Sequence, residues 1–270
     1  MNHVSYLEFL EQEAKSIIEV AYSSLDNLGI LFSGGKDSCV VRHLVNRAMP
    51  EMKPVLLSID TGYSFAEVDK FFTTLDYMPE VRTVESSIQA GLVPPRAPGV
   101  SRNADQSVTL KHALNEFKFQ GVFCGARRDE DRARAKERVF SHRDSSGNWR
   151  PENQRMEMYG YLTDMRLSEN EHFRIFPISN WTELDVWEYI AKYDVKIPSI
   201  YYAHQRPGYE GTVRFRTVGD TLVTKPVAST AMNAEEVFTE LLSASISERG
   251  ATRLDDKDMS MEQRKLAGYF

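Results

Sequence analysis

The stretch Ser33-Gly34-Gly35-Lys36-Asp37-Ser38 separates two apolar runs, Gly29-Ile30-Leu31-Phe32 and Cys39-Val40-Val41-Arg42-His43-Leu44-Val45. The first run predicts a buried strand, and the second predicts a helix. A strand, a glycine turn and a helix N-terminus together form an anion site, because backbone N–H groups and the helix dipole point at whatever occupies the turn. Glycines let the backbone approach a phosphate, hydroxyls donate hydrogen bonds, and lysine adds a positive charge.

The order of these residues differs from that of the commoner phosphate loop, G-x-x-x-x-G-K-[ST]. Ile30 stands where the first glycine of that motif would be, and Asp37 follows the lysine. The stretch instead resembles the pyrophosphate loop of the N-type ATP pyrophosphatases. That resemblance implies that Ser33, Gly34, Gly35, Lys36, Asp37 and Ser38 bind the β- and γ-phosphates of ATP, which the enzyme cleaves between the α- and β-phosphates.

Composition sets limits on the class of protein. Apolar residues make up 41% and charged residues 27% of the 270 residues, which is typical of a globular protein with a real core. We expect no membrane span and no secretory signal, and two cysteines indicate a reducing compartment, the cytoplasm. Two cysteines also cannot form a four-cysteine metal site, and we expect no bound metal cluster. The net charge of −6 predicts no general attraction to nucleic acid.

The order of predicted elements indicates an α/β fold. Strands are expected at 29–32, 54–60, 81–84, 121–125 and 173–176, and helices at 5–25, 64–76, 107–118, 182–192 and 234–244. Alternating strands and helices predict a mostly parallel, twisted sheet with helices on both faces. Ligands of such sheets bind at the carboxyl ends of the strands, so the loops after strands 29–32, 54–60 and 121–125 share one crevice.

The remaining segments are expected to be irregular. Residues 92–106, with three prolines, and residues 126–170, with few apolar positions, read as irregular loops, and a loop as long as the second is usually functional or mobile. We predict one ATP pyrophosphatase domain at 1–200. A C-terminal extension at 201–270 is expected to pack on that domain and to contact a partner.

A second signal follows the strand at 121–125. Residues 127–138 hold six basic and four acidic side chains, and arginine favours bidentate contact with phosphate or another oxyanion. The alternative is a solvated helix with pairs such as Glu130–Arg134. Its place at the carboxyl end of a strand favours function.

Several motifs together make a more specific resemblance. Gly125-Ala126-Arg127-Arg128-Asp129-Glu130 and Arg134-Ala135-Lys136-Glu137-Arg138 are similar to the small, nucleotide-binding subunit of the bacterial two-subunit sulfate adenylyltransferases. The same similarity extends to Asp60-Thr61-Gly62, Phe176-Pro177-Ile178-Ser179-Asn180-Trp181-Thr182-Glu183, Val213-Arg214-Phe215-Arg216-Thr217 and the ending at Gly268-Tyr269-Phe270. This family implies a fold of the adenine nucleotide α-hydrolase type. It also implies the reaction of sulfate with MgATP to give adenylyl sulfate and pyrophosphate, with a GTPase large subunit as partner.

Candidate roles follow from this chemistry, which is mostly positioning and charge stabilisation. Lys36, Arg127 and Arg128 are the candidate catalytic residues, the arginines acting on the α-phosphate or the acceptor. Asp60 and Gly125 join the six loop residues as nucleotide-binding candidates, although Asp60 alternatively caps the next turn. Candidates for contact with the acceptor or a partner are Arg134, Lys136, Arg138, Arg214 and Arg216.

Three departures from the family keep an alternative open. Gly34 replaces the usual isoleucine, the segment after Gln205-Arg206-Pro207 is short, and Cys39 and Cys124 lie beside the predicted site. Cys39 falls in a first helical turn, where the dipole is expected to lower the pKa of a thiol, so both cysteines are candidates for sulfur handling; the alternative is that they are small buried residues.

The alternative function is an ATP pyrophosphatase of a DNA phosphorothioation system, with a cysteine desulfurase and DNA as partners. The acidic net charge argues against tight DNA binding. A regulatory nucleotide-binding subunit is disfavoured by the intact loop with Lys36 and Asp37. A thiol-dependent reductase is disfavoured because no cysteine follows Cys124.

Overall fold

The computed structural model describes residues 5–130, 132–158, 161–162 and 164–243. Its centre is a six-stranded sheet in the order β3-β2-β1-β4-β8-β5. The bounds of these strands are β1 Leu28–Leu31, β2 Val55–Asp60, β3 Glu80–Thr83, β4 Gly121–Phe123, β5 Phe140–Arg143 and β8 His172–Ile175. The first five in spatial order run parallel, and β5 pairs antiparallel with β8.

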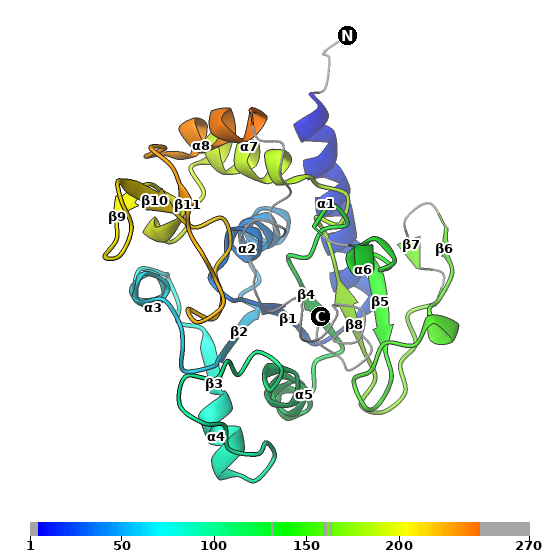
Figure 1. The fold of residues 1–270 in the computed structure, drawn as a ribbon. Coiled ribbons are helices and arrows are strands. Elements are labelled where there is room, and N and C mark those ends of the chain that lie inside the picture. The colour runs from blue at the N-terminus through cyan, green and yellow to red at the C-terminus, as the bar shows by residue number, and fades with distance from the viewer. Residues whose placement is uncertain (1–4, 131, 159–160, 163, 244–270) are drawn as a thin grey trace.

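Helices cover both faces of the sheet (Figure 1). Their bounds are α1 Tyr6–Ser24, α2 Lys36–Ala48, α3 Ala66–Phe72, α4 Val84–Gln89, α5 Gln106–Phe117, α6 Arg132–Ala135, α7 Glu183–Tyr193 and α8 Ala234–Leu242. Helices α1, α2 and α7 share one large apolar cluster with strand residues such as Ile30 and Ile175. Helix α5 packs in a smaller cluster on the opposite face, with residues such as Leu57 and Val122. The predicted mostly parallel sheet between two helical layers is therefore confirmed.

Helices α1 and α7 each begin with a capping box. The Ser5 hydroxyl accepts the backbone N–H of Glu8 at 3.2 Å, and Thr182 caps α7 in the same way through Asp185 at 3.2 Å. In both caps the carboxylate returns a bond to the capping residue, which satisfies donors that a helix start leaves open. The buried stripe of α1, including Leu10 and Ile17, then faces the core.

The interpretation of 126–170 as an irregular loop is wrong. This segment contains α6, the edge strand β5, and a short hairpin of β6 (Glu157–Met158) and β7 (Tyr161–Leu162). Strand β5 has buried residues at all four positions, yet it reads Phe-Ser-His-Arg, so no apolar alternation marks it. Its pairing with β8 and the buried ion pair between Arg143 and Glu137 hold it in the sheet.

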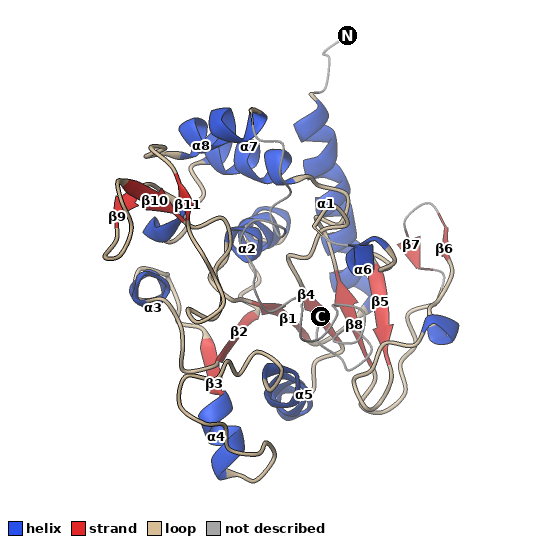
Figure 2. Cartoon of the chain, viewed as in Figure 1, coloured by secondary structure: helices blue, strands red, loops and turns tan. Residues whose placement is uncertain are grey.

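The chain from residue 199 to residue 243 packs against α3 and α7 (Figure 2). A 3₁₀ helix at Ser199–Tyr201 and a three-stranded antiparallel sheet lead to α8, which packs against α7. The strands of that sheet are β9 His204–Gln205, β10 Thr212–Arg214 and β11 Val227–Ala228. In the described part of the chain, no helix is both long and apolar enough to cross a bilayer.

Candidate active site

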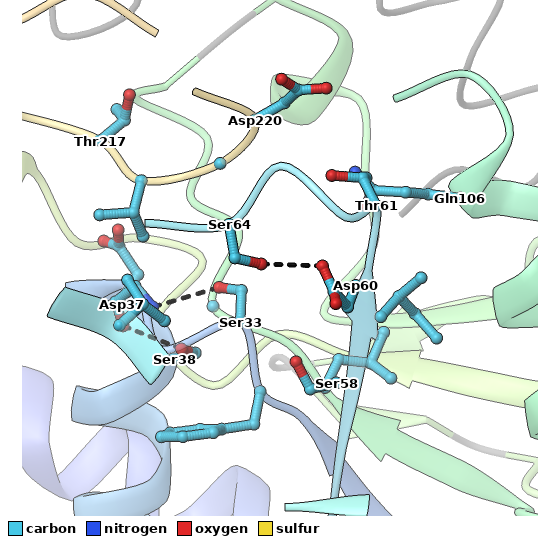
Figure 3. A pocket seen from close by; sticks show the side chains of 18 of the residues that line it. Ser33, Asp37, Ser38, Ser58, Asp60, Thr61, Ser64, Gln106, Thr217 and Asp220 are labelled. Carbon is cyan, nitrogen blue, oxygen red and sulfur yellow. Dashed lines mark hydrogen bonds between the residues drawn. The ribbon is translucent and has the colours of Figure 1, made fainter. Parts of the chain in front are cut away.

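A cavity of about 270 Å³ opens at the carboxyl ends of β1, β2 and β4. Strand β1 pairs with β2 on one side and β4 on the other, so the connections on its two sides run in opposite directions along the sheet. Such a switch point is where ligands of open α/β sheets bind. Figure 3 shows polar side chains from Ser33, Asp60, Thr217 and Asp220 around this space.

The loop after β1 has the geometry of a backbone anion site. Ser33, Gly35, Asp37 and Ser38 all line the cavity, and Gly35 is the N-cap of α2 without a side-chain cap. The Ser33 hydroxyl accepts the Gly35 N–H at 3.2 Å, and the Ser38 hydroxyl donates to the Gly35 carbonyl at 2.8 Å. The positive end of the α2 dipole therefore lies at the cavity, where phosphate charge is favoured.

Gly34 explains why the loop turns so sharply. Its φ is +72°, a left-handed conformation that residues with a Cβ rarely adopt. A Cβ built there would also lie 2.7 Å from Val68 and 2.9 Å from the ring of Phe72. Glycine at this position, where the resemblance implied isoleucine, therefore fits this conformation of the loop.

Lys36, Asp37 and Arg127 form one ion-paired group at the base of the loop. Lys36 and Arg127 are buried, and the Asp37 carboxylate receives Lys36 Nζ at 3.0 Å and Arg127 Nε at 2.8 Å. Burial raises the pKa of Asp37, but the two adjacent cations outweigh it, so the pKa lies below its usual value. Neither Lys36 nor Arg127 is among the residues that line the cavity.

Arg128 points away from this group. It bonds to Asn180 Oδ1 and to the Glu137 carbonyl at 3.1 Å, while its backbone N–H donates to the Ser179 carbonyl at 2.9 Å. Gly125, by contrast, lines the cavity and lies directly against the first turn of α2. The strand end and the phosphate-loop helix therefore meet at a position without a side chain.

Asp60 lies at the opposite wall, where β2 ends. Its Oδ1 accepts the Gly62 N–H at 2.7 Å and the Ser64 hydroxyl at 2.9 Å, so it does cap the following turn (Figure 3). It also lines the cavity. Apolar side chains around this end, such as Leu57 and Val68, offer a surface for a flat base.

The five arginines and lysines predicted to contact an acceptor or partner separate into groups. Arg134 is buried and lines the cavity. This position does not fit the alternative interpretation, in which Arg134 lay on a solvent-exposed helix face. Lys136 and Arg138 are exposed. Arg214 and Arg216 are buried and pair with Glu240 and Glu183, respectively, and neither lines the cavity.

Sequence reasoning missed the residues that arrive from far along the chain. The buried Tyr201 hydroxyl accepts the Lys36 N–H at 3.0 Å, and residues 217–220 line the cavity beside it. Asn103 and Gln106 contribute from the segment expected to be an irregular loop. No local motif marks Tyr201 or residues 217–220, because tertiary packing of the later chain, including the 3₁₀ helix η2 (Ser199–Tyr201) against α3, brings them to the loop.

Both cysteines are buried, and their thiols are poor nucleophiles. Burial raises the pKa of the Cys39 thiol, and burial also raises the pKa of the Cys124 thiol against the opposing effect of nearby Arg174. The expectation that the helix dipole lowers the Cys39 pKa is therefore wrong, because removal from water dominates. Cys124 nevertheless lines the cavity.

We expect both thiols to resist alkylation. A raised pKa means a smaller thiolate fraction at neutral pH, so iodoacetamide will modify the native protein at least about tenfold more slowly than the urea-unfolded protein. Mass spectrometry of timed samples checks this, with Cys39→Ser and Cys124→Ala variants identifying each site. Equal rates in the folded and unfolded protein would contradict the assignment.

Comparison with known proteins shows the family to which the chain belongs. The phosphoadenosine phosphosulfate reductase domain model matches residues 27–226. Sulfate adenylyltransferase subunit 2 of Mycolicibacterium gilvum is 44% identical, covering 99% of this chain and 95% of that protein. The proteins of the same name from Mycobacterium tuberculosis H37Rv and Streptomyces lavendulae are 43% and 42% identical, covering 99% of this chain and 95% and 92% of their own lengths.

Solved structures support the fold. Candida glabrata FMN adenylyltransferase superposes with a TM-score of 0.52 at 16% identity, covering 82% of this chain and 63% of that one. A likeness at that identity shows the shared architecture alone. The sequence relatives carry the assignment further: this chain belongs to the family of sulfate adenylyltransferase subunit 2 proteins, built on a phosphoadenosine phosphosulfate reductase domain.

Proposed function

We propose that this chain is the nucleotide-binding subunit of a sulfate adenylyltransferase, which converts sulfate and MgATP to adenylyl sulfate and pyrophosphate. The similarity to subunit 2 proteins over nearly the whole chain carries the proposal. The cavity supports it, because a phosphate loop and a helix N-terminus meet a strand end there. The relatives do not favour the DNA phosphorothioation alternative.

In this proposal the Ser33–Ser38 loop holds the β- and γ-phosphates and the apolar wall near Asp60 holds the adenosine. A sulfate oxygen attacks the α-phosphorus, and the bond from that phosphorus to the bridging oxygen breaks as pyrophosphate leaves. Lys36 and Arg127, held in place by Asp37, supply positive charge behind the loop. Arg128 is not proposed for this role, because its side chain bonds to Asn180 and to the Glu137 carbonyl instead. Mg²⁺ enters with ATP, as this ion is usually held by phosphates plus one or two carboxylates.

The name of the relatives includes the word subunit, and we propose that the partner is a GTPase large subunit. The segment 201–270 is proposed to contact it, because Met232 and Leu242 expose apolar side chains in the described part of that segment. Free, buried cysteines suit the reducing cytoplasm, which is the compartment we propose.

The direct test is turnover of the reconstituted pair. The purified chain, with the large subunit, GTP, MgATP and radiolabelled sulfate, should form adenylyl sulfate and pyrophosphate in equal amounts. Omission of sulfate is the control. Formation of ADP and phosphate, or no uptake of ATP in calorimetry, would overturn the proposal. AMP formation that needs DNA and a cysteine desulfurase would support phosphorothioation instead.

A further inference from the structure

Two backbone donors at the N-terminus of α2 are already bonded to hydroxyl groups. The first N–H groups of a helix have no partner within the helix, and in a phosphate loop they are the usual donors to an anion. Here the Gly35 N–H donates to the Ser33 hydroxyl at 3.2 Å, and the Lys36 N–H donates to the Tyr201 hydroxyl at 3.0 Å. These two N–H groups are therefore not directly available to an anion in the cavity.

The Tyr201 hydroxyl has one hydrogen-bonding function left. A phenol oxygen can accept a hydrogen bond while its own proton donates another. Tyr201 accepts the Lys36 N–H, and within the described part of the chain its proton has no acceptor. Burial raises the pKa of Tyr201, so the oxygen keeps this proton at neutral pH. Because Tyr201 lines the cavity, a group bound there can accept the proton's hydrogen bond.

The hydroxyl lies at the phosphate-loop end of the cavity. A Cβ built on Gly35 would lie 3.1 Å from Ser33 Oγ and 3.4 Å from the Tyr201 hydroxyl oxygen, so the two hydroxyl groups converge beside Gly35. All three residues line the cavity. The Ser38 hydroxyl differs, because it donates to the Gly35 carbonyl at 2.8 Å. Ser33 and Tyr201 are therefore better placed than Ser38 to donate to a ligand.

Packing fixes the ring of Tyr201 before a ligand binds. The ring lies edge-to-face against Trp187 of α7, with the two centroids 6.0 Å apart, and both side chains are buried. Tyr201 also ends η2, which packs against α3. A donor held in this way loses little freedom on binding, which favours a preorganised contact.

We propose that Tyr201 donates its hydroxyl proton to an oxygen of the pyrophosphate half of bound ATP, and so links the N-terminus of α2 to the ligand. The inference rests on the proposed function for the identity of the ligand. It adds a phosphate-binding residue that lies 165 positions after Lys36. A hydroxyl that accepts an N–H donates more strongly, because linked hydrogen bonds polarise one another.

The same contact would assist the departure of pyrophosphate. Negative charge grows on the pyrophosphate as the bond between the α-phosphorus and the bridging oxygen breaks. A fixed donor at that group stabilises the growing charge, whereas the proton itself stays on the tyrosine. Tyr201 would thus bind the leaving group without taking part in proton transfer.

The first test variant is Tyr201→Phe, which keeps the ring against Trp187 and removes the hydroxyl. Calorimetry with the full chain gives the Kd for pyrophosphate in the presence of Mg²⁺. This Kd should rise at least about tenfold, as expected for the loss of a hydrogen bond to a charged group. If Tyr201→Phe binds pyrophosphate as tightly as the wild type, the proposal is wrong.

Tyr189→Phe is the matched control. Tyr189 is also buried, packs edge-to-face against Trp181 and is hydrogen-bonded through its hydroxyl to His43 at 3.0 Å. It is not among the described residues that line the cavity. Loss of its hydroxyl should leave the Kd for pyrophosphate unchanged.

A second substitution separates a donor to the ligand from a cap on the loop. Tyr201→Phe also removes the acceptor of the Lys36 N–H, so a purely structural hydroxyl would give weaker binding as well. Tyr201→ortho-fluorotyrosine keeps the hydroxyl but makes its proton more acidic, so the group donates more strongly and accepts more weakly. A Kd for pyrophosphate below the wild-type value supports the donor. An unchanged or higher Kd overturns it.

Pyrophosphate binding also separates this inference from the proposed function, because it needs neither sulfate nor a partner subunit. If the two Tyr201 substitutions shift the Kd as expected, the phosphate contact holds even when the reconstituted pair makes no adenylyl sulfate. If the pair makes adenylyl sulfate but neither substitution shifts the Kd, the proposed function stands and this inference fails. A wild-type chain that does not bind pyrophosphate also overturns the inference.

Discussion

Replacement of Gly125 by alanine will reduce adenylyl transfer by about 100-fold or more, because misplacement of reacting groups by an ångström has effects of that size. A Cβ at this position would lie 2.8 Å from the Asp37 carbonyl carbon, 2.9 Å from the Asp37 Cβ and 2.9 Å from the Ser38 nitrogen. These are mainly backbone atoms of the first turn of α2, which no rotamer change can move aside. The end of β4 and the phosphate loop must therefore separate. Initial rates with saturating ATP and sulfate measure the loss.

Gly91→Ala is the matched control for this variant. A Cβ at Gly91 would be strained by the backbone, because the φ of this residue is +71°. It would nevertheless meet no atom within 4 Å. It should lower stability by about 1 kcal/mol and leave activity intact. If Gly125→Ala retains more than half of the wild-type rate, the close approach of strand and helix has no role in catalysis.

Asp37→Asn is expected to lower the free energy of unfolding at pH 7 by about 3 kcal/mol, because it removes the carboxylate that two buried cations share. Breaking a buried ion pair by removing one partner costs about 3–5 kcal/mol. The Lys36 and Arg127 side chains are 0% and 1% exposed, but the Asp37 side chain keeps 24% exposure, so we expect a loss at the lower end of that range. Urea denaturation followed by tryptophan fluorescence gives the value. The double variant Asp37→Asn/Arg127→Met should recover part of the loss, since it removes one of the two buried cations that share this carboxylate.

The same carboxylate predicts a pH dependence. The pKa of Asp37 is lowered in the folded chain, so its contribution to stability is complete above its ordinary value of 3.8 and is lost as the pH falls through the lower, folded value. The stability difference between the wild type and Asp37→Asn should therefore be constant from about pH 5 to 8 and shrink below about pH 4. A difference that grows on acidification would show that Asp37 is not held as a carboxylate.

Most strands of the sheet and the position of the candidate site could be predicted from the sequence. The loop at Ser33–Ser38 is predictable because strand, turn and helix are neighbours in the chain, and the loop groups that we propose to bind phosphate all lie within those six residues. Gly125 follows for the same reason, as it ends a recognisable strand. The shared crevice then results from a general rule of parallel sheets rather than from any one residue.

The remainder depended on contacts that no local pattern records. Strand β5 is buried, but it contains polar residues such as Arg143. Buried strands are usually recognised in a sequence by their apolar residues, so β5 was missed. Arg214 looked available for a ligand or partner, yet it pairs with Glu240 of α8, which follows much later in the chain. Cys39 behaves as a buried residue because tertiary packing outweighs the local field of its helix.

The contact between Lys36 and Tyr201 has a consequence for biosynthesis. The two residues are 165 positions apart, and the tyrosine hydroxyl receives a backbone N–H of the loop. While the chain is being translated, the first βαβ units can leave the ribosome and pair, but the proposed nucleotide pocket stays incomplete until Tyr201 has emerged. A stalled nascent chain that ends before η2 should therefore hold the early part of the sheet and still bind ATP poorly.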